Sequence, residues 1–290
     1  MNFSLAETAA CGLLVEMALE EDLGAAGDVT SRAIIPPDWT GRAAFIARSA
    51  GVLAGLPAVG SVFAAVDANL TLQPLHEDGA RLEPGQRIAI GVGPLGSLLT
   101  AERTALNFLQ RLSGIATMTR RYVDAVAGLP VKILDTRKTT PGWRLLEKYA
   151  VRCGGGQNHR LGLYDGVLIK DNHLAALGGG SEALELAVYR TRQELKHPMI
   201  LEVEVDAIDQ LQAALARLPN IVLLDNMTLD QLQDAVQLRN LVAPGVNLEA
   251  SGGVTLETVR AIAETGVDRI SVGALTHSAP ALDIALDYLK

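Results

Sequence analysis

Short apolar runs alternate with helix-like stretches in the part of the chain beyond Pro130. Six runs have the length and the branched side chains of buried strands, at 131–134, 167–169, 200–205, 221–224, 246–248 and 269–272. Between the later runs, apolar residues recur at helical spacing, at 208–218, 229–241 and 256–265. Strands that alternate with helices form parallel βα units, so the pattern predicts a barrel or a doubly wound sheet. We favour an incomplete barrel, because about 145 residues are few for the eight-stranded form.

The part of the chain before Pro130 shows a mixed order of elements. Ser4 and Glu7 have capping-box spacing ahead of a helix that should end near Gly24. A loop follows, and further elements are expected in this order: strands at 43–46 and 51–53, a helix at 59–66, strands at 70–75 and 87–92 with a turn at 83–86, and a long helix from about 100 to 127. Gly114 is expected to bend or interrupt that helix. This order predicts an α+β first domain that ends near residue 110.

Polar residues follow the expected strands of the second part at their carboxyl ends, where ligands bind in parallel α/β proteins. Polar ends in such a series indicate an active site rather than chance surface. In chain order these residues are Asp135, Thr136, Arg137, Lys138, Thr139, Lys170, Glu202, Glu204, Asp225, Asn226, Glu249 and Ser251. The last two runs also lead into small residues, which are Gly252, Gly253, Gly273 and Ala274.

The stretch 157–173, which reads QNHRLGLYDGVLIKDNH, places cations around one buried strand. A lysine directly after such a strand either extends to water or meets an anion, because a desolvated charge needs a partner. Five cations gather near the strand ends although the net charge of the chain is -8, and they predict a ligand with several phosphates or carboxylates. They are Arg137, Lys138, His159, Arg160 and Lys170.

Acidic and glycine-containing segments complete the predicted site. Glu202 and Asp225 could coordinate Mg²⁺, hold sugar hydroxyls or stabilise a developing positive charge. The segments 251–253 and 272–274 follow the last two strands, where barrels often bind a phosphate through backbone N–H groups. A Gly-Gly pair alone is more often just a turn.

Composition excludes several classes of function. A net charge of -8 argues against general nucleic-acid binding, which needs a basic face. The N-terminus shows no signal-peptide pattern and no long apolar window occurs, so we expect a cytoplasmic protein with no membrane contact. Cys11 and Cys153 are most simply buried residues without a role.

Two alternatives to non-covalent anion chemistry stay open at this point. A Schiff base at Lys138 or Lys170 would make the protein an aldolase or synthase of phosphosugars. A non-catalytic anion-binding or regulatory protein would bind the same ligands without turnover. No Gly-x-Ser-x-Gly elbow is present, and His159 and His173 lack metal-ligand spacing.

Several ordered motifs together resemble the quinolinate phosphoribosyltransferase family, and the likeness spans nearly the whole chain. The motifs are EDLG at 21–24, GDVT at 27–30, ERTALN at 102–107, DTRKTTP at 135–141, GGQNHR at 155–160, IKDNH at 169–173, EVEV at 202–205, LDNM at 224–227 and ASGG at 250–253. The resemblance implies an N-terminal α/β sandwich domain at 1–112, an incomplete α/β barrel of six or seven strands at 113–275, and a C-terminal helix, within 276–290, that returns to the first domain and packs on it. A nicotinate-using enzyme is the nearest rival, but a second carboxylate on the substrate would explain the excess of cations.

The implied reaction joins quinolinate to phosphoribosyl pyrophosphate, with Mg²⁺, and gives nicotinate mononucleotide, pyrophosphate and CO₂ in NAD biosynthesis. The resemblance also implies a homodimer in which Arg103 enters the partner's site; from its chemistry alone, Arg103 is most simply solvated surface. Arg137, His159, Arg160 and Lys170 match positions that hold the carboxylates of quinolinate. The remaining matches, around the ribose, pyrophosphate, metal and 5'-phosphate, are Thr136, Lys138, Glu202, Asp225, Ser251, Gly252, Gly253, Val272, Gly273 and Ala274, with Glu202 and Asp225 bound to Mg²⁺ directly or indirectly.

Overall fold

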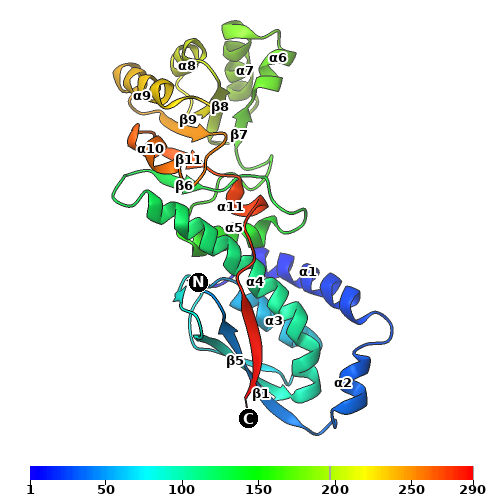
Figure 1. Ribbon diagram of the computed structural model, residues 1–290. Coiled ribbons are helices and arrows are strands. Elements are labelled where there is room, and N and C mark those ends of the chain that lie inside the picture. The colour runs from blue at the N-terminus through cyan, green and yellow to red at the C-terminus, as the bar shows by residue number, and fades with distance from the viewer. Residues whose placement is uncertain (196, 290) are drawn as a thin grey trace. The chain divides into compact units, whose positions relative to one another are not determined.

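A computed structural model (Figure 1) describes residues 1–195 and 197–289, and the chain forms two structural units. Unit 1 comprises residues 1–120, 138–156 and 274–290, and unit 2 comprises residues 121–137 and 157–273. Within the described ranges, no helix has both the length and the apolar composition that a membrane span requires.

Three helices come from the N-terminal part of unit 1. The capping box predicted at Ser4 and Glu7 is confirmed at the start of α1 (Leu5–Leu23), which packs against α3 (Leu56–Val66). The loop predicted after Gly24 was only partly right, because it contains the short helix α2 (Val29–Ile34). The Asp28 carboxylate accepts the backbone N–H of Ser31 at 2.9 Å and caps this helix.

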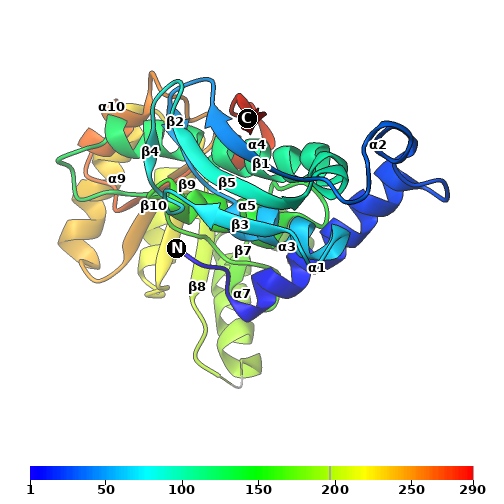
Figure 2. The ribbon, with the colours of Figure 1, turned by 90° about the horizontal axis from the view of Figure 1, so that it is seen from below.

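The main sheet of unit 1 is antiparallel and includes the C-terminal strand. The resemblance implied a helix here, which was wrong, because residues 284–289 are extended and pair with another strand. The order of the sheet is β12 (Ile284–Leu289), β1 (Thr40–Ala47), β5 (Arg87–Pro94) and β3 (Thr71–Pro74). Figure 2 shows β1, β5 and β3 side by side, and in Figure 1 the red C-terminal strand runs beside β1. A second small sheet joins β2 (Gly51–Val52) to β4 (Arg81–Leu82), a strand that the apolar pattern did not predict because it has only two residues.

The long helix α4 (Leu95–Ala125) begins five residues before the predicted start and is continuous through Gly114. The interruption expected at Gly114 is therefore absent from this helix. This glycine is needed for close packing instead, because a Cβ there would collide with the backbone carbonyl of Pro280. Two further helices, α5 (Arg144–Cys153) and α11 (Ala274–His277), also belong to unit 1.

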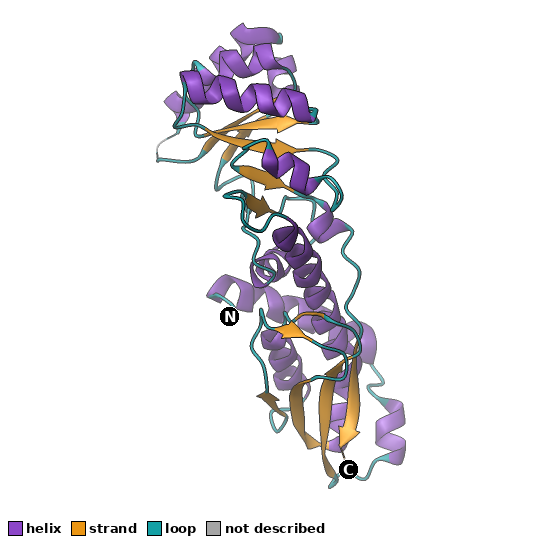
Figure 3. Ribbon diagram, turned by 60° about the vertical axis from the view of Figure 1, so that its left-hand side comes forward, coloured by secondary structure: helices purple, strands orange, loops and turns teal. Residues whose placement is uncertain are grey.

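Unit 2 is built on a six-stranded parallel sheet, which confirms the predicted incomplete barrel. The sheet order is β6 (Lys132–Leu134), β11 (Arg269–Ser271), β10 (Asn247–Ser251), β9 (Ile221–Asp225), β8 (Leu201–Val205) and β7 (Val167–Ile169). Figure 3 shows helices along one side of these strands. The helices of the βα units are α6 (Asp171–Ala176), α7 (Gly180–Glu194), α8 (Ile208–Leu215), α9 (Leu229–Val242) and α10 (Val259–Glu264).

Alternation along these strands decides which side chains share the inner face of the sheet. Successive strand residues point to opposite faces, so Glu202 and Glu204 share one face of β8 while Val203 lies on the other. In register, Glu204 pairs with Leu223, and Leu223 with Glu249 of β10. Glu249 is therefore in register with Glu204 on this face, and Glu202 lies two residues further from the carboxyl end of β8.

Candidate active site

A buried ionic cluster lies on the inner face of the unit 2 sheet. His159 Nε2 is 3.0 Å from Glu202 Oε2 and 3.3 Å from Glu249 Oε1, and the Nε of Arg269 is 2.7 Å from Glu249 Oε2. Glu202 is 2% exposed and Glu249 is fully buried. The cluster links β8, β10 and β11 through charges that are almost entirely removed from water.

The charges of this cluster depend on one another. Burial alone would lower the pKa of His159, but the carboxylates of Glu202 and Glu249 raise it to about 9. The backbone N–H of Arg160 opposes this effect, because it donates to Nδ1 of His159 at 2.8 Å and so favours the imidazole that is protonated on Nε2 alone. Burial raises the pKa of Glu202, whereas His159 and Arg269 outweigh burial at Glu249 and lower its pKa.

The segment that carries His159 is fastened to the end of β6. Gln157 bridges to Leu134, and its backbone N–H donates to the Ile133 carbonyl at 2.9 Å. The fully buried Asp135 carboxylate accepts the backbone N–H of His159 at 2.8 Å and the side-chain amide of Asn158 at 2.6 Å. These contacts explain why a residue outside any strand reaches the interior of the sheet.

Two arginines lie close together beside this segment. Burial and the nearby Arg137 guanidinium lower the pKa of Arg160, which indicates two like charges near one another. Arg160 is held by a hydrogen bond of 3.0 Å from one terminal guanidinium nitrogen to the Gly166 carbonyl, just before β7. A pair of half-buried guanidinium groups is suited to bind carboxylates, because each presents a planar fork of N–H donors.

An acidic pocket of about 490 Å³ opens at the carboxyl ends of β8 and β9. Glu204 and Asp225 line it, together with Asp171, Asp206 and Asp209. The ammonium of Lys170 lies 2.7 Å from Glu204 Oε2. The Lys170 side chain is 46% exposed, so this ion pair is accessible to an incoming ligand. The carboxylate oxygens suit a hard cation such as Mg²⁺, which is commonly held by one or two carboxylates plus substrate phosphates.

A hydrogen bond joins the residue after β9 to the end of β10, where a tight turn follows. The Asn226 backbone N–H donates to the Ser251 carbonyl at 2.9 Å, and its side-chain amide donates to Asp225 Oδ2 at 2.8 Å. Gly252 and Gly253 have φ angles of +93° and +58°, and a Cβ on Gly252 would collide with the Asn226 side chain. Glycine is therefore required at this turn, and both glycines are exposed.

The predicted site residues divide between the two units. Arg103, Lys138 and Ala274 belong to unit 1, and the exposed Arg103 lies on α4. The residues in unit 2 are Thr136, Arg137, His159, Arg160, Lys170, Glu202, Asp225, Ser251, Gly252, Gly253, Val272 and Gly273.

Within unit 2, the structure separates two acidic positions that the prediction had combined. Glu202 lies in the buried cluster with His159, whereas Asp225 lies in the acidic pocket. Glu204 is the β8 residue that shares that pocket; the sequence placed it at the strand end, but no individual role was predicted for it. The alternation of side chains along EVEV at 202–205 could have indicated Glu204, because it lies on the same face as Glu202 and two residues nearer the end of the strand.

The ligand atoms of His159, Glu202 and Glu249 lie within 4.8 Å of one another, close enough to hold a metal ion. Arg269 nevertheless pairs with Glu249, and Nε2 of His159 lies within 3.3 Å of both carboxylates. We therefore interpret this group as an internal ion network and look for the cation site in the acidic pocket.

Comparison with known proteins gives a consistent result over both units. The model of the quinolinate phosphoribosyl transferase N-terminal domain matches residues 28–113, and that of the C-terminal domain matches residues 115–287. The chain is 50% identical over 277 residues to a nicotinate-nucleotide pyrophosphorylase [carboxylating] of Mycobacterium leprae, covering 94% of this chain and 95% of that one. It is 43% identical over 288 residues to a quinolinate phosphoribosyltransferase [decarboxylating] of Nicotiana tabacum, covering 94% and 81%.

A solved structure supports the same assignment. The nicotinate-nucleotide pyrophosphorylase of Francisella tularensis is 40% identical, matches with a TM-score of 0.89 and covers 97% of each chain. The chain belongs to the quinolinate phosphoribosyltransferase family.

Proposed function

We propose that this chain transfers the phosphoribosyl group of phosphoribosyl pyrophosphate to quinolinate, with decarboxylation, in NAD biosynthesis. The products are nicotinate mononucleotide, pyrophosphate and CO₂. The observation that carries the proposal is the 50% identity to a carboxylating nicotinate-nucleotide pyrophosphorylase over almost the full length of both chains. The neighbouring guanidinium groups of Arg137 and Arg160 support a substrate with more than one carboxylate.

Quinolinate would be held by cations from the β6 and β7 ends. Arg137 and Arg160 supply forked donors, and Lys170 supplies a point charge once it leaves Glu204. His159 has Nε2 at Glu202 and Nδ1 at the backbone of Arg160, so we assign it to orienting Arg160 rather than to direct contact with a carboxylate.

Phosphoribosyl pyrophosphate would occupy the acidic pocket and the neighbouring turns. Glu204 and Asp225 fit the ribose hydroxyls and Mg²⁺ by their donor chemistry. Bound Mg²⁺ would neutralise charge on the departing pyrophosphate. The backbone at 251–253 and 272–274 fits the 5'-phosphate, and Lys138 fits the pyrophosphate.

The chemistry then needs no protein nucleophile. The bond between the anomeric carbon and pyrophosphate breaks, positive charge develops on the ribose, and Glu204 and Asp225 stabilise it. The ring nitrogen of quinolinate supplies the electron pair for the new bond. The cationic ring next accepts the electrons of the departing 2-carboxylate as CO₂ leaves, and a proton from solvent takes its place. Binding two polyanions beside each other supplies the entropic part of the catalysis.

The test is formation of nicotinate mononucleotide and CO₂ from quinolinate, phosphoribosyl pyrophosphate and Mg²⁺, with nicotinate in place of quinolinate as the control. We expect turnover with quinolinate but not with nicotinate. We also expect the activity with quinolinate to be lost when EDTA removes the metal. Turnover with nicotinate but not quinolinate would refute the substrate assignment. Turnover that survives metal removal would refute the role of Mg²⁺.

The proposed assembly is a cytoplasmic homodimer in which Arg103 completes the site of the other subunit. Its exposure on α4 leaves Arg103 available for such a contact. Mixing inactive Arg103→Ala chains with inactive Lys170→Ala chains should then restore part of the activity, because one of the two sites regains both residues. A mixed dimer, proven by differential tags, that shows no recovery would exclude a shared site.

A further inference from the structure

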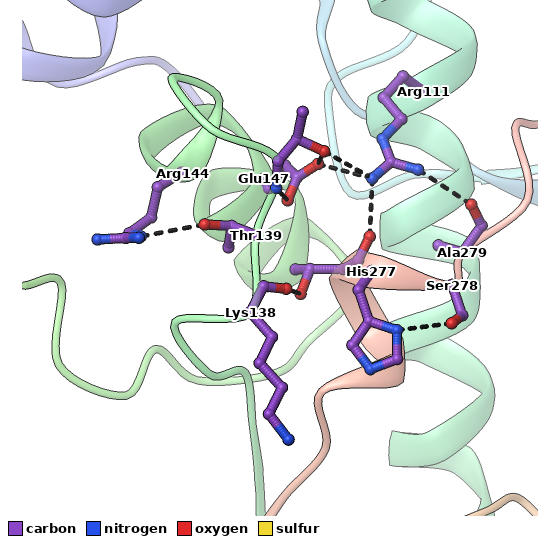
Figure 4. Close-up of polar contacts among 10 residues, drawn as sticks. Arg111, Lys138, Thr139, Arg144, Glu147, His277, Ser278 and Ala279 are labelled. Atoms are coloured by element: carbon purple, nitrogen blue, oxygen red, sulfur yellow. Dashed lines mark hydrogen bonds and ion pairs between the residues drawn. The ribbon is translucent and has the colours of Figure 1, made fainter.

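The loop that carries Lys138 is held by an ion pair of unit 1 whose carboxylate is fully buried. Glu147 of α5 accepts the backbone N–H of Thr140 at 3.2 Å and its hydroxyl at 2.8 Å. A terminal nitrogen of Arg111, on α4, donates to the same carboxylate at 2.6 Å. Figure 4 shows these contacts around one point, with the Lys138 side chain directed away from them.

The same arginine also holds the segment around α11. Arg111 donates to the carbonyl of Thr276 at 2.7 Å and to that of Ala279 at 3.1 Å. The Thr276 hydroxyl in turn donates to the Lys138 carbonyl at 2.8 Å. Arg111 thus fixes the lysine loop from both sides, through Glu147 and through Thr276.

The exposure of these groups argues that the pair orders the loop. Glu147 is fully buried, and its carboxylate binds the backbone of Thr140, two residues after Lys138. An apolar side chain at position 147 could fill the same space without the cost of desolvating a charge. Lys138 itself is exposed, and a long lysine side chain reaches a defined place only if its backbone is fixed.

We propose that Arg111 and Glu147 are positioning residues for Lys138. They fix the main chain at 138–140 so that the lysine ammonium meets the pyrophosphate group, as the proposed function requires. The inference deepens that function, since neither residue touches substrate and both act through Lys138.

The chain offers a closely matched control at Glu7. This glutamate also lies in the first turn of a helix, accepts an upstream backbone N–H, from Ser4 at 2.7 Å, and pairs with an arginine, Arg152. It is 5% exposed, so Glu7→Gln and Glu147→Gln remove the same charge from similar surroundings in the same unit. Of these two glutamates, Glu147 is the one that contacts the lysine loop.

The experiment compares Glu147→Gln, Glu7→Gln and Lys138→Ala in the full chain. We expect Glu147→Gln to lower kcat/KM for phosphoribosyl pyrophosphate at least tenfold and to leave the Kd of quinolinate within twofold. Glu7→Gln should leave both values unchanged at a similar loss of thermal stability. In a Lys138→Ala background, Glu147→Gln should cause no further kinetic loss, because the residue it positions is gone.

Equal kinetic effects of Glu7→Gln and Glu147→Gln, or full additivity with Lys138→Ala, would overturn the proposal. Calorimetric binding of inorganic pyrophosphate with Mg²⁺ separates it from the proposed function. We expect a Kd at least tenfold weaker in Glu147→Gln, and equal binding by wild type and variant would reject the positioning role. Lack of turnover in a wild-type protein that binds pyrophosphate would instead contradict the proposed reaction.

Discussion

The buried ion network of unit 2 gives a stability prediction that can be worked from its contacts. Glu249→Gln keeps the shape of the side chain but removes the charge that pairs with Arg269 at 2.7 Å and His159 at 3.3 Å. Removing one partner of a buried ion pair typically costs about 3–5 kcal/mol. The arginine side chain is 21% exposed and regains some hydration, and His159 can release its proton, so we expect the lower value, about 3 kcal/mol.

Urea unfolding followed by far-UV circular dichroism measures this change. With a slope of about 3 kcal/mol per molar urea, the midpoint of the affected transition should fall by about 1 M. Trp39 and Trp143 both lie in unit 1, so tryptophan fluorescence shows whether the two units unfold together.

An exposed pair in the same unit supplies the control. Arg260 and Glu264 are 3.0 Å apart with side chains 51% and 54% exposed, so Glu264→Gln should cost no more than about 0.5 kcal/mol. Equal midpoints for Glu249→Gln and Glu264→Gln would refute the claim that the buried network stabilises the sheet.

Three further predictions concern packing, pH and the two glutamates of β8. Gly114→Ala should cost several kcal/mol in thermal unfolding because its Cβ meets a backbone carbonyl, while Gly60→Ala in α3, with open space around it, should be neutral or gain up to about 1 kcal/mol; equal effects would contradict the packing reason. Since the folded pKa of His159 is raised to about 9, its stabilisation should be full below about pH 6.5 and be lost as pH rises through 9; an unfolding free-energy difference between wild type and His159→Gln that is constant from pH 6 to 9.5 would disprove this. Glu204→Gln should lower kcat at least tenfold with little loss of stability, and Glu202→Gln should mainly lower the unfolding midpoint; the reverse result would exchange their roles.

The sequence predicted the parallel sheet of unit 2 well for a physical reason. Strands buried on both faces need continuous apolar runs, and all six runs became strands. Short elements such as α2 and β4 were missed because six or two residues are too few to show a period. The role of Gly114 also escaped prediction, because the carbonyl it accommodates lies 166 residues further along the chain.

The candidate site was predicted at the level of strand ends but not of individual partners. Side chains at the ends of β6 to β11 were found because parallel strands all end at one edge of the sheet. The pairing of His159 with both Glu202 and Glu249 depends on the curvature of the sheet and on the Asp135 contacts, neither of which leaves a local pattern. Arg111 and Glu147, 36 residues apart, gave no signal for the same reason.

The position of β12 has a consequence for how the protein is made. This strand pairs with β1 along six residue pairs, from Arg42 with Leu289 to Ala47 with Ile284. At a synthesis rate of about 5–20 residues per second, the ribosome needs roughly 10 to 50 seconds to make the chain between β1 and β12, and β1 lacks this partner for that time. The unit 2 sheet is complete in the nascent chain before that strand appears. Unit 1 therefore exposes an unpaired strand edge until β12 has been made, and this interval is when the growing chain is most open to wrong strand pairing or to capture by a chaperone.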